Sequence, residues 1–288
     1  MKNITANMET LSIFESLKKY DIKPLKRMGQ NFLIDENVLG KIIESAELSK
    51  NDTILEIGPG LGILTIELAK RVKRVIAIEK DKILCQALKK ILEDQRINNV
   101  ELINGDILNT KYKIQATSYK LIANLPYYIT SPVIRKFLEA GNKPASTRGG
   151  EPTRGGPSLM ILMVQKEVAE RICAKPPKMS ILSVAVQFYA EPEIIDYVSK
   201  NCFYPQPKVD SAIIKIVPKQ IPKINTEKFF ALVRAGFSAK RKMLKNNLST
   251  LLEANQLNLE KLGLNPKVRA ENLSINDWLK LFHSQTLY

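Results

Sequence analysis

A short polar turn follows one of the candidate strands of the chain. The stretch IANLPYYITSPVI (Ile122–Ile134) starts with apolar residues and breaks at Asn124, Leu125, Pro126 and Tyr127. Proline ends a central strand because it cannot donate to the ladder. The Asn124 carboxamide oxygen and the backbone carbonyls before Pro126 can accept hydrogen bonds, and Tyr127 has a flat face on which a base can stack. These groups are suited to hold the exocyclic amino group of a base such as adenine.

The chemistry that such a turn could perform is transfer of a group to that amine. An adenine amine is a poor nucleophile because its lone pair is delocalised into the ring. Two acceptors on its hydrogens would draw the nitrogen toward tetrahedral geometry and free the lone pair to attack a methyl donor. No strong general base is required, and the only histidine is His283. Catalysis would then come from positioning and electrostatics.

A glycine-rich turn ends an earlier candidate strand, in ILEIGPGLGILTIELA (Ile54–Ala69). Gly58, Gly60 and Gly62 allow a tight turn and the close approach of a ligand to the backbone. The spacing G-P-G-L-G differs from the G-x-G-x-x-G of dinucleotide-binding proteins. The turn therefore indicates a ligand site of another kind.

Two acidic residues follow the next two candidate strands. Glu79 ends VIAIE, where a carboxylate can accept both hydroxyls of a ribose, and Asp106 ends INGD, where it can accept from an adenine amino group. Together with the glycine turn they predict a cofactor that contains a nucleoside. The chain lacks the P-loop pattern G-x-x-x-x-G-K-[ST], which argues against an ATPase. S-adenosylmethionine carries an adenosine without phosphate and is the preferred cofactor; NAD is the alternative.

The sheet that must position these residues follows from alternating patterns after residue 50. Short apolar stretches alternate with stretches whose apolar residues recur three and four apart, as in amphipathic helices. The strand candidates are DTILEIG, RVIAIEKD, NVELINGDIL, YKLIANLPY, SLMILMVQ, EIIDYVS and SAIIKIV. This order predicts an α/β fold with a mainly parallel sheet and helices on both faces. ILSVAVQFYA fits either a helix or a strand.

The composition changes after PKQIPK, and only helical patterns follow from about residue 225. We therefore predict a catalytic domain over residues 1–219 and a small, all-helical domain over residues 220–288. Within the first, PASTRGGEPTRGGPS (Pro144–Ser158) has the composition of a flexible loop. Its arginines among glycines could contact RNA. A surface insertion without a role is favoured, because long loops cost little stability.

Composition points to a polyanionic partner. The chain has 288 residues with 44 Lys and Arg against 29 Asp and Glu, a formal charge of +15. Such a surplus is typical of proteins that bind nucleic acid or an anionic membrane face. No apolar stretch reaches the length of a bilayer span, and the N-terminus lacks an apolar signal core. The three cysteines have no metal-type spacing, so we expect reduced thiols, no metal site and a cytoplasmic protein.

Seven motifs resemble those of the small-subunit ribosomal RNA adenine N6,N6-dimethyltransferases. They occur in that family's order from about Pro24 onward: GQNFLID, LEIGPGLGILT, AIEKD, NGDIL, ANLPYYITSPVI, LMVQKEVAERI and FYPQPKVDSAII. The resemblance implies a Rossmann-like, S-adenosylmethionine-dependent methyltransferase sheet with a small helical domain. It also implies dimethylation of two adjacent adenosines in a hairpin near the 3′ end of small-subunit rRNA, in a pre-ribosomal particle. The segment 144–158 departs from the family pattern but interrupts none of these motifs.

The resemblance also implies roles for individual residues. The cofactor would be contacted by the residues of the glycine turn, Gly58 and Gly60, and by Asn31, Leu33, Glu79, Asp106 and Asn124. The proline turn after Phe203 can hold its ring against the target adenine beside Leu125, Pro126 and Tyr127, and simple packing of that ring is the alternative. KPLKRMGQNFL (Lys23–Leu33) would form a flap over the cofactor, whose Lys26 and Arg27 touch RNA.

A second basic segment lies near the C-terminus. FSAKRKMLKNNL places Lys240, Arg241, Lys242 and Lys245 on about one and a half turns of an expected helix. With an RNA substrate, these side chains predict a patch that contacts phosphates.

Three other functions compete with this interpretation. One is a large-subunit adenine methyltransferase of the antibiotic-resistance type; FYPQPKVDSAII and VQKEVAERI favour the small-subunit enzymes. Another is a non-catalytic RNA-binding assembly factor, against which the retained Glu79, Asp106 and Asn124 argue. The third is an NAD oxidoreductase, which the glycine spacing and the basic charge disfavour. We expect a monomer.

Overall fold

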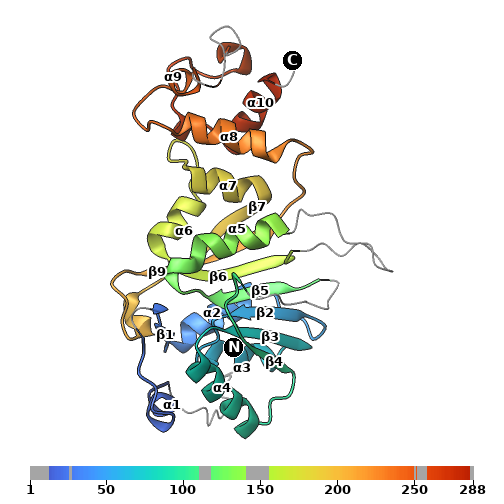
Figure 1. Cartoon of the computed structure of the whole chain (residues 1–288), viewed down its shortest axis with the longest axis vertical. Helices are drawn as coiled ribbons and strands as arrows, with labels where there is room; N and C mark the ends of the chain where they lie inside the picture. Colours follow the sequence, from blue (N-terminus) through green and yellow to red (C-terminus); the bar gives the residue numbers. More distant parts are fainter. Residues whose placement is uncertain are drawn as a thin grey trace, which may run out of the picture.

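The computed structural model of the chain describes residues 13–25, 28–109, 118–140, 156–249, 251 and 258–285. Lys26, Arg27 and residues 144–155 of the expected insertion lie outside these ranges. Within them, the larger part of the molecule is built around a seven-stranded sheet with the order β4-β3-β2-β5-β6-β9-β7 (Figure 1). The predicted α/β fold with a mainly parallel sheet is confirmed.

Five neighbouring strands of the sheet are parallel, and one strand beyond them runs in the opposite direction. The parallel strands are β2 (Thr53–Ile57), β3 (Arg74–Glu79), β4 (Val100–Asn104), β5 (Lys120–Asn124) and β6 (Leu159–Gln165). The reversed strand is β9 (Ser211–Pro218), which pairs antiparallel with β6 on one side and with β7 (Ala190–Val198) on the other. The register places Ile57 beside Ile78, Glu79 beside Asn104, and Asn124 beside Met163. The carboxyl ends of the parallel strands therefore meet at one edge of the sheet, where α/β folds bind ligands.

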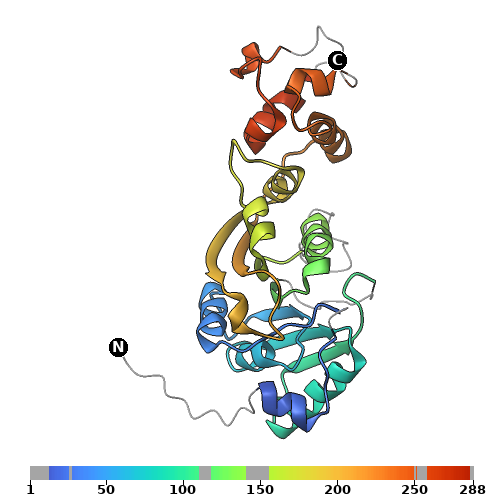
Figure 2. The same ribbon diagram turned by 90° about the vertical axis from the view of Figure 1, so that its left-hand side faces the viewer.

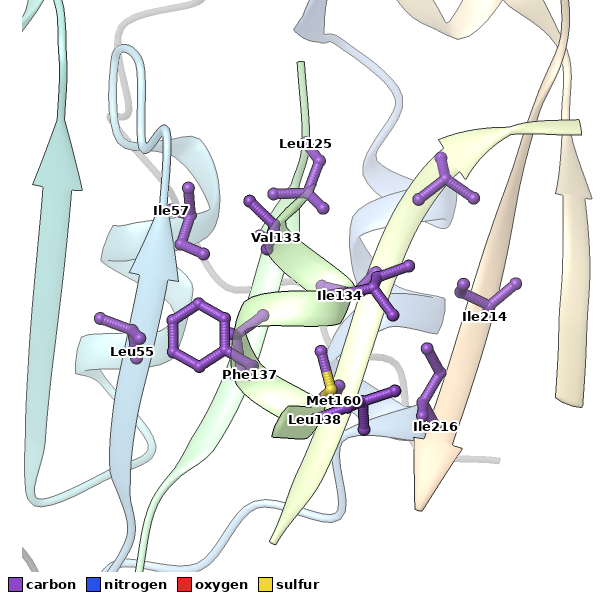
Figure 3. Close-up of a cluster of buried hydrophobic side chains, with 14 of the residues drawn as sticks. Leu55, Ile57, Leu125, Val133, Ile134, Phe137, Leu138, Met160, Ile214 and Ile216 are labelled. Carbon is purple, nitrogen blue, oxygen red and sulfur yellow. The ribbon is translucent and has the colours of Figure 1, made fainter. Parts of the chain in front are cut away.

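Helices cover both faces of the sheet. One face carries α5 (Thr130–Ala140), α6 (Lys166–Ile172) and α7 (Ile181–Tyr189). The other carries α1 (Ile13–Lys19), α2 (Glu36–Ser45), α3 (Ile63–Ala69) and α4 (Lys82–Asp94). Figure 3 shows how Val133, Ile134 and Phe137 of α5 pack over Leu55 and Met160 of the strands below. The ambiguous stretch ILSVAVQFYA forms a helix, α7, whose Ser180 cap accepts from Ser183 N, and only its last residue enters β7.

A helical unit follows β9 and lies at the end of the molecule away from β2–β4 (Figures 1 and 2). Its elements are α8 (Thr226–Gly236), α9 (Leu244–Leu248), the short turns η4 (Glu260–Leu262) and η5 (Ala270–Asn272), and α10 (Ile275–Gln285). Its core around Trp278 and Phe229 also includes Met179 and Phe188, which come from the α7 region. The hydrophobic core of this unit thus extends across the boundary near Lys219. The division into two domains at that point stays a prediction.

The expectation of a helix over FSAKRKMLKNNL is wrong for the first half of this stretch. Helix α8 ends at Gly236, where an added Cβ would lie 2.4 Å from Cη2 of Trp278. The Asn247 side chain donates to the carbonyls of Gly236 and Ala239 at 2.6 and 3.0 Å, so it supplies partners for the end of the helix. Lys240, Arg241 and Lys242 consequently lie in a turn, and only Lys245 lies on a helix, α9.

None of the helices in the described ranges has the length and apolar composition that crossing a membrane requires.

Candidate active site

A pocket opens at the carboxyl edge of the parallel strands. Its lining contains every residue predicted to contact the cofactor or the target base: Asn31, Leu33, Gly58, Gly60, Glu79, Asp106, Asn124, Leu125, Pro126, Tyr127 and Phe203. These residues come from segments far apart in the sequence, and the parallel strands bring them together. The basic residues Lys240, Arg241, Lys242 and Lys245 are exposed and belong to the helical unit, outside this lining.

The glycine turn has a backbone that only glycine adopts easily. Gly58, Gly60 and Gly62 have φ values of 68°, 61° and 86°. The Gly58 N–H donates to the Ile78 carbonyl at 2.9 Å, which ties the turn to β3. A Cβ at Gly60 would lie 3.1 Å from the ring of Phe32, so any side chain there would push against the wall of the pocket.

Glu79 holds the glycine turn from the neighbouring strand. Its Oε2 accepts from the Gly60 N–H at 3.0 Å and its Oε1 from the Asp81 N–H at 2.8 Å. Burial raises the pKa of the Glu79 carboxyl, while the backbone donors at Asp81 and Gly60 act against that rise. The carboxylate is therefore fixed in place, with its oxygens at the pocket.

Asp106 lies one strand further along. Its Oδ1 accepts from the Leu108 N–H at 2.9 Å, and its Oδ2 lies 3.0 Å from Lys80 Nζ. The hydrogen bond from the Leu108 N–H and, to a smaller extent, the Lys80 ammonium keep the pKa of the Asp106 carboxyl below its ordinary value. Asp106 is thus ionised at neutral pH and can accept from a ligand.

Residues 28–33, which end in strand β1 (Phe32–Leu33), line the pocket as a segment that we call the strap. The Gln30 side chain donates to Asp81 Oδ2 at 2.8 Å and accepts from the Leu25 N–H at 2.7 Å. Strand β1 pairs with β8 (Phe203–Tyr204) and places Leu33 beside Phe203. The strap therefore joins the Glu79 side of the pocket to the Phe203 side, and its role as a flap over the cofactor stays a prediction.

Asn124 connects the strap to the proline turn. Its Nδ2 donates to the Asn31 carbonyl at 3.3 Å, an orientation that leaves the carboxamide oxygen as the group able to accept from a ligand. Beyond it, Pro126 precedes the short turn η2 (Tyr127–Ile129). The Tyr127 hydroxyl lies 2.8 Å from Ser211 Oγ, at the start of β9.

The pocket contains one acidic residue that the sequence reasoning missed. Glu56 is only 2% exposed, in β2 just before the glycine turn. Its Oε2 and the nearby Thr65 Oγ1 have no hydrogen-bond partner in the described part of the chain. Burial raises the pKa of Glu56 to about 8; the Thr65 hydroxyl, which is near the carboxyl but outside hydrogen-bonding geometry, acts in the opposite direction, and the Glu79 carboxylate adds to the rise. The sequence feature that could have revealed this residue is an acidic side chain inside the mostly apolar strand TILEI.

The charge of the pocket fits S-adenosylmethionine better than NAD. Among the described residues that line it, Glu79 and Asp106 supply carboxylates, Glu56 with its pKa of about 8 is mostly protonated at neutral pH, and Lys80 alone is basic, paired with Asp106. A pyrophosphate would meet carboxylates with no free cation nearby, whereas a sulfonium and an ammonium would be stabilised. The residues present therefore suit a cationic nucleoside cofactor.

Comparisons with known proteins agree with this geometry. Ribosomal RNA small subunit methyltransferase A of Dehalococcoides mccartyi is 43% identical over 277 residues, covering 93% of this chain and 90% of that protein. Its namesake in Clostridium botulinum (strain Loch Maree) is 42% identical over 278 residues, covering 93% and 96%. The crystal structure of a dimethyladenosine transferase from Plasmodium falciparum superimposes with a TM-score of 0.71 at 31% identity, over 87% and 95% of the two chains. The 23S rRNA methyltransferase ErmE gives a TM-score of 0.71 at 27% identity, over 88% and 99%.

The family model described as ribosomal RNA adenine dimethylase matches residues 23–286, nearly the whole chain. With relatives above 40% identity over most of its length, the chain belongs to the ribosomal RNA adenine dimethylase family.

Proposed function

We propose that this protein transfers methyl groups from S-adenosylmethionine to the N6 amines of two adjacent adenosines in a hairpin near the 3′ end of small-subunit rRNA. One observation carries the proposal: in a member of this family, Asn124 and the proline turn share one acidic pocket with Glu79 and Asp106. The relatives named small subunit methyltransferase A support the choice of subunit.

The cofactor would be held by the acidic residues and the glycine turn. Glu79 accepts from the ribose hydroxyls and Asp106 from the adenine amino group, while Gly58 and Gly60 let the ligand lie against the backbone. Asn31 and Leu33 of the strap close over it. When bound, S-adenosylmethionine supplies an electrophilic methyl group on a positively charged sulfur.

The target adenine would be held by the turn that follows β5. The Asn124 carboxamide oxygen and the Leu125 carbonyl, which precedes Pro126, accept the two N6 hydrogens. They draw the nitrogen toward tetrahedral geometry and hold its protons until one passes to solvent. Tyr127 and Phe203 supply flat surfaces that receive a base taken out of its stack. Catalysis by the protein is then positioning and electrostatics.

The rest of the RNA would be bound by basic side chains outside the pocket. Lys240, Arg241, Lys242 and Lys245 are exposed together at the junction of α8 and α9, and four neighbouring cations favour phosphates. Lys26 and Arg27, which precede the strap in the sequence, would add contacts to the RNA. The substrate would be a pre-ribosomal particle, bound in the cytoplasm by a monomer of this protein.

Large-subunit rRNA is a second candidate substrate, because the structure is equally similar to ErmE by TM-score. The test uses small and large ribosomal subunits from cells that lack this activity. Each is incubated with the protein and methyl-labelled S-adenosylmethionine, and the RNA is digested to nucleosides. We expect label in N6,N6-dimethyladenosine from the small subunit. Label confined to the large subunit would support the second candidate, and label in neither would contradict both.

A further inference from the structure

The hydroxyl of Tyr127 is fixed by a buried serine on another strand. Tyr127 Oη lies 2.8 Å from Ser211 Oγ, and Ser211 is 0% exposed. Tyr127 itself is only partly buried and lines the pocket. A partly exposed tyrosine ring at a short turn can swing about its side-chain torsions, so an anchored hydroxyl at its far end restricts the ring to one orientation.

Ser211 is a suitable anchor because its backbone is held on both sides. It is the first residue of β9 and pairs with Gln165 of β6 and with Val198 of β7. The residue before it is also tied down, since the Lys166 N–H donates to the Asp210 carbonyl at 3.0 Å. The hydroxyl of Ser211 therefore has a fixed position in the sheet.

The same anchor point holds the segment that carries the second aromatic wall of the pocket. The Lys200 N–H donates to Asp210 Oδ1 at 3.0 Å, at the start of the turn η3 (Lys200–Cys202) that leads directly into Phe203. Tyr127 is thus tied to Ser211 and the Phe203 segment to the adjacent Asp210. Although Tyr127 and Phe203 are far apart in the sequence, the Tyr127 hydroxyl and the segment before Phe203 are both tied to Asp210 and Ser211, where β9 begins.

We propose that Ser211 is a positioning residue for the target base. The Ser211 hydroxyl holds the Tyr127 ring at a fixed position relative to Phe203, so that the two aromatic rings form a slot for a flat purine. The inference rests on the proposed function, which places the target adenine between these side chains. Without the anchor, the ring must be ordered by the base itself, and that ordering cost appears as slower or weaker insertion of the base.

The test is a double-mutant cycle with Ser211→Ala and Tyr127→Phe, which remove the two ends of one hydrogen bond and keep the ring. Each single variant is expected to slow single-turnover methyl transfer by about twofold to twelvefold, the range that corresponds to ordering one side chain. The double variant should be no slower than either single variant, because the bond is lost only once. Ser211→Thr, which keeps the hydroxyl, should be closer to wild type than Ser211→Ala.

A second measurement reports the base directly. The substrate RNA carries 2-aminopurine in place of the target adenine, and its fluorescence is quenched when the base stacks on an aromatic ring. Ser211→Ala should reduce that quenching, while RNA affinity, which phosphate contacts dominate, and cofactor affinity stay near wild type. Ser183→Ala is the control, since Ser183 is equally buried and its hydroxyl donates to the carbonyl of Ser180, the cap of α7.

Additive effects of the two single variants, wild-type quenching in Ser211→Ala, or the same loss of quenching in Ser183→Ala would each overturn the inference. These outcomes differ from failure of the proposed function, in which the wild-type protein itself transfers no methyl group to small subunits. A wild-type protein that methylates small subunits, together with a Ser211→Ala variant that does so equally fast, would refute the role of Ser211 alone.

Discussion

Lys80 and Asp106 form an ion pair at the pocket, with 3.0 Å between Lys80 Nζ and Asp106 Oδ2. The carboxylate assigned to the adenine amino group of the cofactor is therefore already paired with a side chain of the protein. Lys80 directly follows Glu79 at the end of β3, and its side chain is 51% exposed. The cofactor must compete with this ammonium for Asp106.

Replacing Lys80 by methionine should therefore tighten cofactor binding. An exposed ion pair of this kind contributes at most about 1 kcal/mol, so the gain should not exceed about fivefold at low salt. Calorimetry at two salt concentrations checks this, because the difference between wild type and Lys80→Met should shrink as salt rises. Lys82→Met, at the start of α4, is the matched control and should bind as wild type does. Weaker binding by Lys80→Met would show that Lys80 contacts the cofactor itself.

Glu79→Ala should weaken S-adenosylmethionine binding for two reasons. It removes the proposed ribose acceptor, and it leaves the Gly60 and Asp81 N–H groups without the acceptor that they have now. Glu79→Gln keeps one side-chain oxygen and should lose less affinity than Glu79→Ala. Calorimetry with the cofactor, alongside the melting temperature of each variant, tests the role. Unchanged affinity in Glu79→Ala would remove Glu79 from the cofactor site.

Glu56 should make the protein less stable as the pH rises from about 4.5 to about 8. The carboxyl has a pKa near 4.5 when unfolded and about 8 when folded, so in this range the folded state binds more protons. The free energy of unfolding then falls with pH, by up to about 1.4 kcal/mol per unit, and levels off above the folded pKa. Below the unfolded pKa the contribution is fully present.

The measurement is denaturant unfolding of wild type and Glu56→Gln across that range. Other groups titrate as well, so the informative quantity is the difference between the two proteins. That difference should change with pH in favour of Glu56→Gln. Parallel curves would mean that Glu56 is ionised in the folded protein and that a partner compensates its charge.

The basic residues between α8 and α9 should set the salt dependence of RNA binding. Neutralising Lys240, Arg241, Lys242 and Lys245 together should weaken binding and reduce the slope of log K against log salt by up to about 3.6, the value for four phosphate contacts. The control neutralises four exposed cations around β3, α4 and β4, away from the helical unit: Lys73, Lys89, Lys90 and Arg96. An equal change in both variants would indicate that the salt dependence reflects only the overall charge of +15 and not a specific phosphate-binding patch.

Local patterns were sufficient to predict the strands and the residues at their ends. Glu79, Asp106 and Asn124 each end or follow an apolar stretch, and parallel strands bring such ends together whatever the details of packing. The turn at Lys240–Lys242 was not predictable in this way. It depends on Trp278, distant in the sequence, packing against Gly236, and on the Asn247 side chain folding back to the end of α8.

Contacts between distant polar residues were also beyond the sequence. Nothing near Tyr127 indicates that its hydroxyl meets Ser211, because the pair forms only when β9 inserts beside β6. The high pKa of Glu56 likewise follows from burial under the glycine turn, which depends on the packing of α3 on the sheet. Hydrophobic periodicity describes single elements, and these features arise between elements.

Asn124→Ala should act mainly on the chemical step. It removes one of the two proposed acceptors for the adenine amine, and loss of one such preorganised contact typically lowers turnover by about a hundredfold or more. It also removes the hydrogen bond from Asn124 Nδ2 to the Asn31 carbonyl, so the strap should hold the cofactor less tightly. RNA affinity should change little, because distant phosphate contacts supply most of it.

Tyr127→Ala should differ from Asn124→Ala, since it removes a stacking surface worth roughly 1–3 kcal/mol and so weakens placement of the base. Single-turnover methyl transfer, RNA affinity and melting temperature are measured for both variants. Asn124→Asp is the matched control, because it keeps the size and one acceptor oxygen of the side chain but loses the donor to Asn31. If Asn124→Ala transfers methyl groups at the wild-type rate, or loses activity only in proportion to unfolding, Asn124 and Pro126 merely shape a turn and the amine is held elsewhere.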